Sequence, residues 1–119
     1  MDDEKMVLQV SGQMLKRLGH TVVFAEDGAE AVDRVTASIR AGTPFDGAIL
    51  DLTIRDGMGG REAMAEIRRI APDIRSIVSS GYSEDPVMHD YRNYGFDAAL
   101  PKPYDKKEMA AALFSVFNF

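Results

Sequence analysis

The sequence predicts an α/β protein built on a doubly wound parallel sheet. Along the 119 residues, short apolar runs typical of strands alternate with longer segments whose apolar residues recur every three or four positions. Strands that alternate with amphipathic helices indicate parallel βαβ units. The predicted strands are apolar throughout, as expected when helices cover both faces of a sheet.

Apolar residues at helical spacing predict five helices. The fourth, over residues 84–94, has the weakest pattern, and the last runs from Lys106 to about Phe117 with Asp105 as its N-cap. The apolar stripes are, in chain order, Val7, Val10, Met14, Leu15 and Leu18; Ala31, Val32, Val35 and Ile39; Ala63, Met64, Ile67 and Ile70; Val87, Met88, Tyr91 and Tyr94; and Met109, Leu113, Val116 and Phe117.

Four short apolar runs are predicted as strands, over residues 21–25, 45–50, 74–79 and 96–100. Their β-branched and aromatic residues favour strands over helices. In an open parallel sheet, ligands bind beyond the carboxyl ends of the strands. The polar residues that follow the strands are therefore the first candidates for function.

Composition and charge exclude several classes of protein. The chain has no cysteine, which excludes disulfides and thiolate metal sites, and with only His20 and His89 a histidine-rich zinc site is not expected. A net charge of -5 argues against a nucleic-acid-binding surface. We find no apolar run of the roughly 20 residues that a membrane span needs, and no signal-peptide pattern at the start. We therefore expect a single cytoplasmic domain over residues 1–119.

Polar residues with complementary chemistry follow three of the predicted strands. Asp51 follows the second strand, Ser79 and Ser80 end the third, and Lys102 follows the fourth. An acidic run over residues 2–4 precedes the first helix. Because parallel strands end at the same edge of a sheet, these groups are predicted to meet there.

The chemistry of these groups suits phosphoryl transfer. Clustered carboxylates repel one another, and Mg²⁺ prefers a site with one or two carboxylates, waters and a phosphate oxygen. A carboxylate such as Asp51 can attack phosphorus and form an aspartyl phosphate. The ammonium of Lys102 and a small hydroxyl can hold the phosphoryl oxygens, since such transfer requires mainly positioning and charge neutralisation.

Four motifs together resemble the receiver domain of two-component response regulators. They are Asp2-Asp3-Glu4, Asp51-Leu52, Ser80-Gly81 and Lys102-Pro103. The resemblance covers nearly the whole chain and implies a flavodoxin-like receiver fold that acts as a phosphoacceptor switch, not as an enzyme. The stretches 51–54, 57–60, 79–83 and 94–96 are most similar to receivers of hybrid sensor histidine kinases, which implies a histidine kinase or phosphotransfer domain as partner.

The resemblance implies a metal and acceptor site. Asp51 matches the phosphoacceptor. Mg²⁺ is implied at Asp2, Asp3, Asp51 and the backbone carbonyl of Thr53, with Asp3 as the more direct ligand and Asp2 acting partly through water.

The resemblance also implies a switch hydroxyl and a phosphate-binding lysine. Ser80 matches the hydroxyl because Gly81 follows it, although Ser79 is a competing choice. Lys102 matches the lysine, and Pro103 matches the position of a cis peptide bond in the family.

The sequence departs from the family pattern at three places that bear on function. Only Met1 precedes the acidic run, where the family has a buried apolar strand. Arg55 stands where the family usually has proline, so the loop after Asp51 is expected to be mobile. Ala99 stands where many receivers carry an aromatic residue, which excludes a ring rotation as the switch at that position.

The missing first strand would leave the middle of the sheet open. The neighbouring strands can close up, a segment of a second chain can fill the gap, or the tail over residues 114–119 can supply a strand. We favour a final helix over a tail strand, and hence association of two chains into a homodimer, because sheet edges and exposed apolar surface promote pairing.

Other functions remain as alternatives. A degenerate pseudo-receiver that acts only as a binding module agrees with the missing strand, but not with intact Asp51, Ser80 and Lys102. An aspartyl-phosphate hydrolase resembles Asp-x-Asp at the nucleophile, whereas this chain has Thr53 at the second position. A flavin mononucleotide carrier needs a phosphate-binding loop after the first strand, which the sequence lacks.

Overall fold

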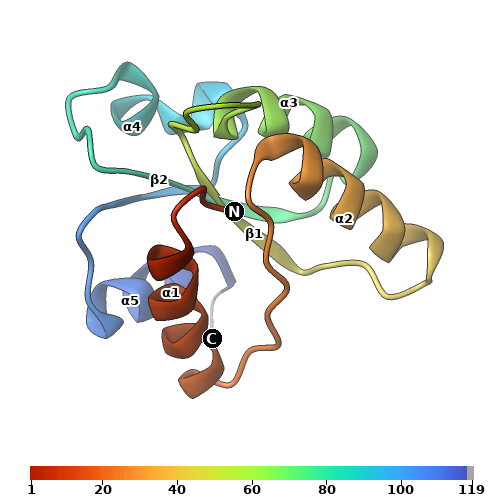
Figure 1. Cartoon of the computed structure of the whole chain (residues 1–119), viewed down its shortest axis with the longest axis horizontal. Helices are drawn as coiled ribbons and strands as arrows, with labels where there is room; N and C mark the ends of the chain where they lie inside the picture. The colour runs from red at the N-terminus through yellow and green to blue at the C-terminus, as the bar shows by residue number, and fades with distance from the viewer. Residues whose placement is uncertain (118–119) are drawn as a thin grey trace.

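A three-stranded parallel sheet forms the centre of the computed structural model, which describes residues 1–117 (Figure 1). Its strands are β1 (Gly47–Asp51), β2 (Arg75–Ser80) and β3 (Ala98–Pro101), in the spatial order β1-β2-β3. Asp51 pairs in register with Ser79, and Ser80 with Pro101. The predicted strands over 45–50, 74–79 and 96–100 are therefore confirmed to within two residues at each end.

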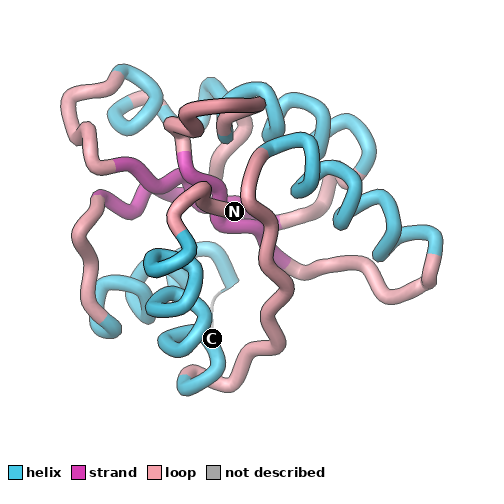
Figure 2. Tube along the Cα trace, viewed as in Figure 1, coloured by secondary structure: helices cyan, strands magenta, loops and turns pink. Residues whose placement is uncertain are grey.

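Helices cover both faces of the sheet, as the doubly wound pattern predicted (Figure 2). On one face lie α2 (Gly28–Arg40) and α3 (Gly60–Ile70), and on the other lie α1 (Lys5–Arg17) and α5 (Lys106–Phe117). The first face buries Val35, Met64 and Ile67, and the second buries Met109 and Leu113. Two apolar clusters thus hold the sheet between them.

Side-chain caps define where several helices begin. Asp27 accepts a hydrogen bond from the backbone N–H of Glu30 and so caps α2. Asp105 and Glu108 exchange two such bonds at the start of α5, which confirms the predicted cap.

The predicted helix over 84–94 is instead two short elements. They are α4 (Pro86–His89) and a 3-10 turn, η1 (Tyr91–Tyr94). Val87 and Met88 are buried as expected, but the backbone leaves helical geometry at Asp90. A stripe this short buries too few apolar side chains to stabilise a continuous helix.

Two residues of the predicted stripes are exposed. Val10 is 48% and Ile39 is 40% exposed. At the equivalent inward positions the structure buries Gly12 and Ser38. The helices were placed correctly, but their inward faces differ from the predicted stripes. On α1 the Phe24 ring packs closely against Gly12, where there is no side chain to hold it away.

The predicted strand over residues 21–25 is wrong. The segment forms no strand, although Ala25 is buried and its carbonyl accepts the backbone N–H of Asp2 at 3.1 Å. A strand needs a neighbour with which to exchange hydrogen bonds. Along most of residues 21–25 that neighbour is absent from the described part of the chain.

Met1 and Asp2 occupy the last two positions of the central strand that the sequence lacks. The Met1 nitrogen donates to the Ile49 carbonyl at 2.7 Å, and the Asp51 N–H donates to the Met1 carbonyl at 3.0 Å. This is the hydrogen-bond pattern of a parallel pair. Among residues 1–117, the first strand of the family is thus absent as predicted, and the hydrogen bonds of Met1 and Asp2 anchor the acidic run.

The flanking segments do not close the gap. Within residues 1–117, β1 pairs with β2 and with Met1, and not with residues 21–25. The tail alternative is wrong for residues 114–117, which belong to α5, while Asn118 and Phe119 lie outside the described residues. None of the helices in the described chain has the length and hydropathy needed to traverse a bilayer.

Candidate functional site

The site forms where β1 and β3 end and the chain begins. Asp51 is the last residue of β1 and is 5% exposed, and Lys102 follows β3. The Lys102 ammonium lies 3.2 Å from Asp51 Oδ1 and 2.6 Å from Asp2 Oδ2. Asp51 and Lys102, which the sequence placed at separate strand ends, therefore meet Asp2 of the acidic run around one cation.

The two candidate hydroxyls differ in what they contact. Ser79 Oγ donates to the Leu100 carbonyl at 2.9 Å, across β2 and β3. Ser80 Oγ accepts the N–H of Tyr82 at 3.0 Å, at the end of β2 where the chain turns away from the sheet. Ser79 therefore links β2 to β3, whereas Ser80, the last residue of β2, holds the start of the loop beside the site.

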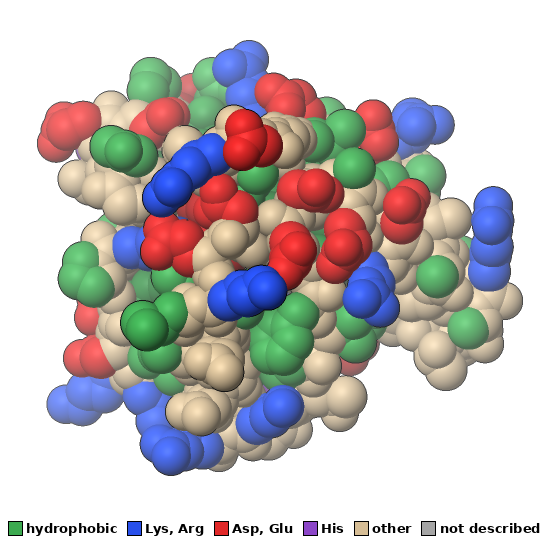
Figure 3. All heavy atoms as spheres, viewed as in Figure 1, with side chains coloured by type: hydrophobic (Ala, Val, Ile, Leu, Met, Phe, Trp, Pro, Cys, Tyr) green, Lys and Arg blue, Asp and Glu red, His purple; other side chains and the backbone are tan. Residues whose placement is uncertain are grey.

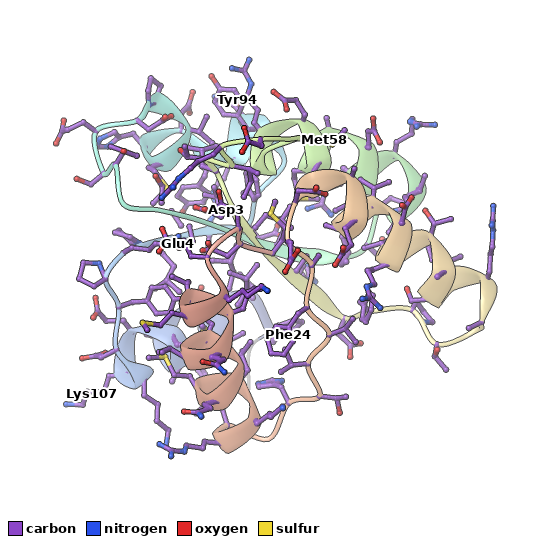
Figure 4. The ribbon with its side chains drawn as sticks, in the orientation of Figure 1. Asp3, Glu4, Phe24, Met58, Tyr94 and Lys107 are labelled. Atoms are coloured by element: carbon purple, nitrogen blue, oxygen red, sulfur yellow. The ribbon has the colours of Figure 1, made fainter. Side chains whose placement is uncertain are left out.

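The acidic run converges on the same edge (Figure 4). Oxygens of Asp2, Asp3 and Glu4 lie within 4.8 Å of one another. Asp3 Oδ2 also accepts the N–H of Arg55 at 3.1 Å, so it contacts the loop after Asp51. Glu4 was not predicted to have a role of its own, and only its adjacency to Asp2 and Asp3 in the sequence could have indicated one.

The surface around this edge is acidic. Figure 3 shows Asp and Glu side chains gathered over the start of the chain and the neighbouring helices α2 and α3. Oxygen donors of this kind, close together and without nitrogen or sulfur ligands, fit a hard cation such as Mg²⁺. Thr53 is exposed in the loop that follows Asp51.

Burial and charge shift the acid–base equilibria of the site. Burial raises the pKa of Asp51 above its ordinary value, the negative charge of Asp2 raises it further, and Lys102 opposes both. Burial lowers the pKa of Lys102, but the hydrogen bond to Asp2 and the attraction of Asp51 outweigh it, and the net pKa is raised. Lys102 therefore stays charged beside two carboxylates that repel each other.

The chain after Lys102 is fixed in position. The Lys102–Pro103 peptide bond is cis, as the resemblance implied. The hydroxyl of Tyr104 is hydrogen-bonded to that of Ser11 in α1. Sequence reasoning missed this pair, because no pattern in the sequence relates two residues so far apart.

The response regulator receiver domain family matches residues 1–114. A response regulator receiver protein of Anaeromyxobacter is 31% identical over 103 residues, covering 87% of this chain and 41% of that protein. The sensor kinase CckA of Brucella abortus is 32% identical over 116 residues, covering 95% of this chain and 12% of that protein. The chain therefore spans less than half the length of these relatives.

Solved structures share the fold. The chemotaxis complex CheX-CheY-BeF3-Mg from Borrelia burgdorferi contains a chain that superposes with a TM-score of 0.87 at 24% identity, covering 98% of this chain and 84% of that one. A receiver domain protein from Methanospirillum hungatei superposes with a TM-score of 0.77 at 25% identity, covering 92% and 83% of the two chains. By its family match and its fold, this chain belongs to the response regulator receiver domain family of two-component signalling.

Proposed function

We propose that this receiver accepts one phosphoryl group on Asp51, in a reaction that depends on Mg²⁺, and that it changes conformation as a result. The observation that carries the proposal is the position of Lys102, whose ammonium contacts both Asp2 and Asp51 at the carboxyl ends of the strands. Such an arrangement neutralises charge at the place where a phosphoryl group would arrive.

The proposed transfer uses Asp51 as the nucleophile. One of its oxygens forms a bond to phosphorus while the P–N bond of a phosphohistidine breaks, and the electron pair of that bond goes to the histidine nitrogen. The Lys102 ammonium can turn from Asp51 toward a phosphoryl oxygen, because it already lies 3.2 Å from Asp51 Oδ1. Its contact with Asp2 keeps it beside the acceptor throughout.

We propose Asp2, Asp3, Asp51 and the Thr53 carbonyl as the residues that hold Mg²⁺. When bound, the ion supplies positive charge that offsets the developing charge on the phosphoryl oxygens. The close oxygens of the acidic run support this assignment, and they add Glu4 as a neighbour of the site. A Mg²⁺ complex with a CheY protein is among the solved structures that share this fold.

The proposed switch runs through Ser80. Its hydroxyl holds the Tyr82 N–H at 3.0 Å, so a movement of Ser80 toward the phosphoryl group would release the loop after β2. Ala99 has no ring to reorient. The change is therefore expected in the backbone of the 80–94 segment, which carries α4 and η1.

We propose a histidine kinase or a phosphotransfer domain as the donor. The resemblance to receivers of hybrid sensor kinases and the similarity to the sensor kinase CckA both support this class of partner. Figure 3 shows that Asp and Glu side chains are exposed on this face, which such a donor would approach.

Beryllofluoride, which mimics a phosphoryl group on a carboxylate, tests the proposal. Addition of Mg²⁺ and beryllofluoride is expected to shift the amide NMR signals of Asp51, Ser80 and Lys102 in the 119-residue chain. Asp51→Asn is expected to abolish the shifts, and Asp56→Asn, which changes an exposed residue of the same loop, is expected to retain them. Equal responses of the two variants would contradict the assignment of Asp51.

A further inference from the structure

Hydrogen bonds tie the loop between β1 and α3 to other parts of the fold. Its first residue, Leu52, donates its N–H to the Ser79 carbonyl at 2.9 Å, near the end of β2. Toward its other end, the Met58 carbonyl accepts the N–H of Gly28, the first residue of α2, at 2.7 Å. The middle of the loop is held by a further bond, which goes to the acidic run (Figure 4).

This further bond joins the loop to a proposed ligand of the metal. The Arg55 N–H donates to Asp3 Oδ2 at 3.1 Å, across 52 positions of the chain. The family usually has proline where this chain has Arg55, and proline carries no N–H. Arg55 therefore supplies a backbone donor that the usual residue of the family cannot supply.

The two aspartates of the acidic run are held differently. Asp2 Oδ1 accepts the N–H of Glu4 at 3.0 Å, and Asp2 Oδ2 accepts a hydrogen bond from the Lys102 ammonium at 2.6 Å. Both oxygens of Asp2 are thus engaged by donors of this chain. Among residues 1–117, Asp3 is hydrogen-bonded through Oδ2 alone, so its Oδ1 remains for an ion. Of this pair, Asp3 is the carboxylate better placed to ligate a cation directly.

The bond from Arg55 restricts Asp3 in the way that a metal ligand requires. Asp3 is only half-buried, so packing alone does not fix its side chain. A carboxylate that accepts a backbone N–H at one oxygen has fewer orientations to lose when an ion binds at the other. Groups that hold metal ligands in this way are typically worth roughly 10–100-fold in metal affinity.

We propose that the backbone N–H of Arg55 is a positioning group of the magnesium site, which holds Asp3 through Oδ2 and leaves Oδ1 for the ion. This inference rests on the proposed Mg²⁺ ligands, Asp2, Asp3, Asp51 and the Thr53 carbonyl. The coupling is reciprocal, because an ion that fixes Asp3 also fixes the loop that carries Thr53. Metal binding and order in the loop after Asp51 are therefore linked through one hydrogen bond.

A matched pair of variants isolates the N–H. Arg55→Pro removes both the guanidinium and the N–H, whereas Arg55→Ala removes the guanidinium and keeps the N–H. Titration of the 119-residue chain with Mg²⁺, followed by amide NMR, measures the dissociation constant of each. We expect Arg55→Pro to bind Mg²⁺ about tenfold more weakly than Arg55→Ala. Since both variants lose the same charge, a change in net charge cannot produce this difference.

Hydrogen exchange tests the contact in the absence of metal. Arg55 is exposed, so its amide should exchange rapidly unless Asp3 holds it. Asp3→Ala is expected to speed this exchange about tenfold, as for the loss of one hydrogen bond to a charged group. Glu4→Ala removes an equal charge from the same acidic run and is expected to leave the rate nearly unchanged. In the unaltered chain, Mg²⁺ should slow the exchange of the Arg55 amide further.

The exchange measurements also decide the matter if Arg55→Pro does not fold. The comparison of Asp3→Ala with Glu4→Ala then tests the contact itself. The effect of Mg²⁺ on the Arg55 amide of the unaltered chain tests its coupling to the metal, and an exchange rate that Mg²⁺ does not change would overturn that coupling.

Two results would overturn this inference and leave the proposed function intact. Equal Mg²⁺ affinities of the two Arg55 variants would show that the N–H does not position the ligand. Equal exchange rates of the Arg55 amide in Asp3→Ala and Glu4→Ala would show that Asp3 does not hold the N–H in solution. Failure of the unaltered chain to bind Mg²⁺ would instead overturn the proposed metal ligands, and this inference with them.

Discussion

Lys102 and Asp2 form the shortest ion pair among residues 1–117, with 2.6 Å between Nζ and Oδ2. The pair joins the first residues of the chain to the loop after β3. Since Lys102 also contacts Asp51 at 3.2 Å, one ammonium offsets the repulsion between two carboxylates that are 4% and 5% exposed. The integrity of the site and the stability of the fold are thereby coupled.

Removal of this cation should destabilise the fold. Lys102→Met leaves Asp2 and Asp51 without their partner, and we expect the free energy of unfolding to fall by about 1–3 kcal/mol. Urea unfolding at pH 7 measures the change. Lys107→Met, at an exposed position, serves as the control and should change stability by less than about 0.5 kcal/mol. Similar losses in both variants would contradict the coupling.

Neutralising Asp51 should have the opposite effect. Its pKa is raised in the folded state, chiefly by burial, so its charged form destabilises the fold at every pH above the unfolded pKa of 3.8. We expect Asp51→Asn to raise stability at pH 7 by about 1 kcal/mol. The gain should shrink as the pH falls and disappear below about pH 3, where Asp51 is protonated in both states. Thermal unfolding at pH 7 and about pH 3 measures it, and a gain that persists at the lower pH would contradict this account.

The amino group of Met1 should give folding stability a second dependence on pH. Burial lowers the pKa of the Met1 ammonium from 8.0 to about 6. Between these values the unfolded state binds more protons, so stability should rise as the pH rises from about 6 to 8. The full effect is up to about 3 kcal/mol. Nα-acetylation of Met1 should remove this rise in stability. If stability depends on pH in the same way after acetylation, another group is responsible.

Phosphorylation should reorganise the loop after β2. It adds about -1.5 to -2 charges at Asp51, and Ser80 is expected to turn from the Tyr82 N–H toward the phosphoryl oxygens. Amide NMR shifts should then extend from Ser80 through α4 and η1 to Tyr94. Ser80→Ala should reduce these distant shifts more than Ser79→Ala, because Ser79 is bonded to Leu100. Shifts confined to the loop after Asp51 would argue against this route.

The sequence predicted the architecture well where a local pattern determines it. Burial at Ala63, Met64 and Ile67 follows the helical period of α3, and the cap at Asp105 follows from residue type. Residues 21–25 were mispredicted because their strand character depends on a neighbour that the chain lacks. Local propensity describes what a segment prefers, but it does not show whether a partner is present.

The candidate site was predictable for a different reason. Asp51 and Lys102 end or follow strands of a parallel sheet, and topology alone brings such residues to one edge. The hydrogen bonds of Met1 to Ile49 and Asp51 were not predictable, because a single residue is too short to show the apolar pattern that identifies a strand. The same holds for the hydrogen bond between Ser11 and Tyr104, which depends on how α1 packs beside α5.

Intact-mass spectrometry after incubation with acetyl phosphate and Mg²⁺ tests the central claim most directly. We predict that the chain gains one phosphoryl group, that excess chelator prevents the gain, and that Asp51→Asn abolishes it while the control Asp56→Asn retains it. Equal labelling of both variants, or undiminished labelling in the presence of chelator, would contradict the assignment of Asp51 as a Mg²⁺-dependent phosphoacceptor.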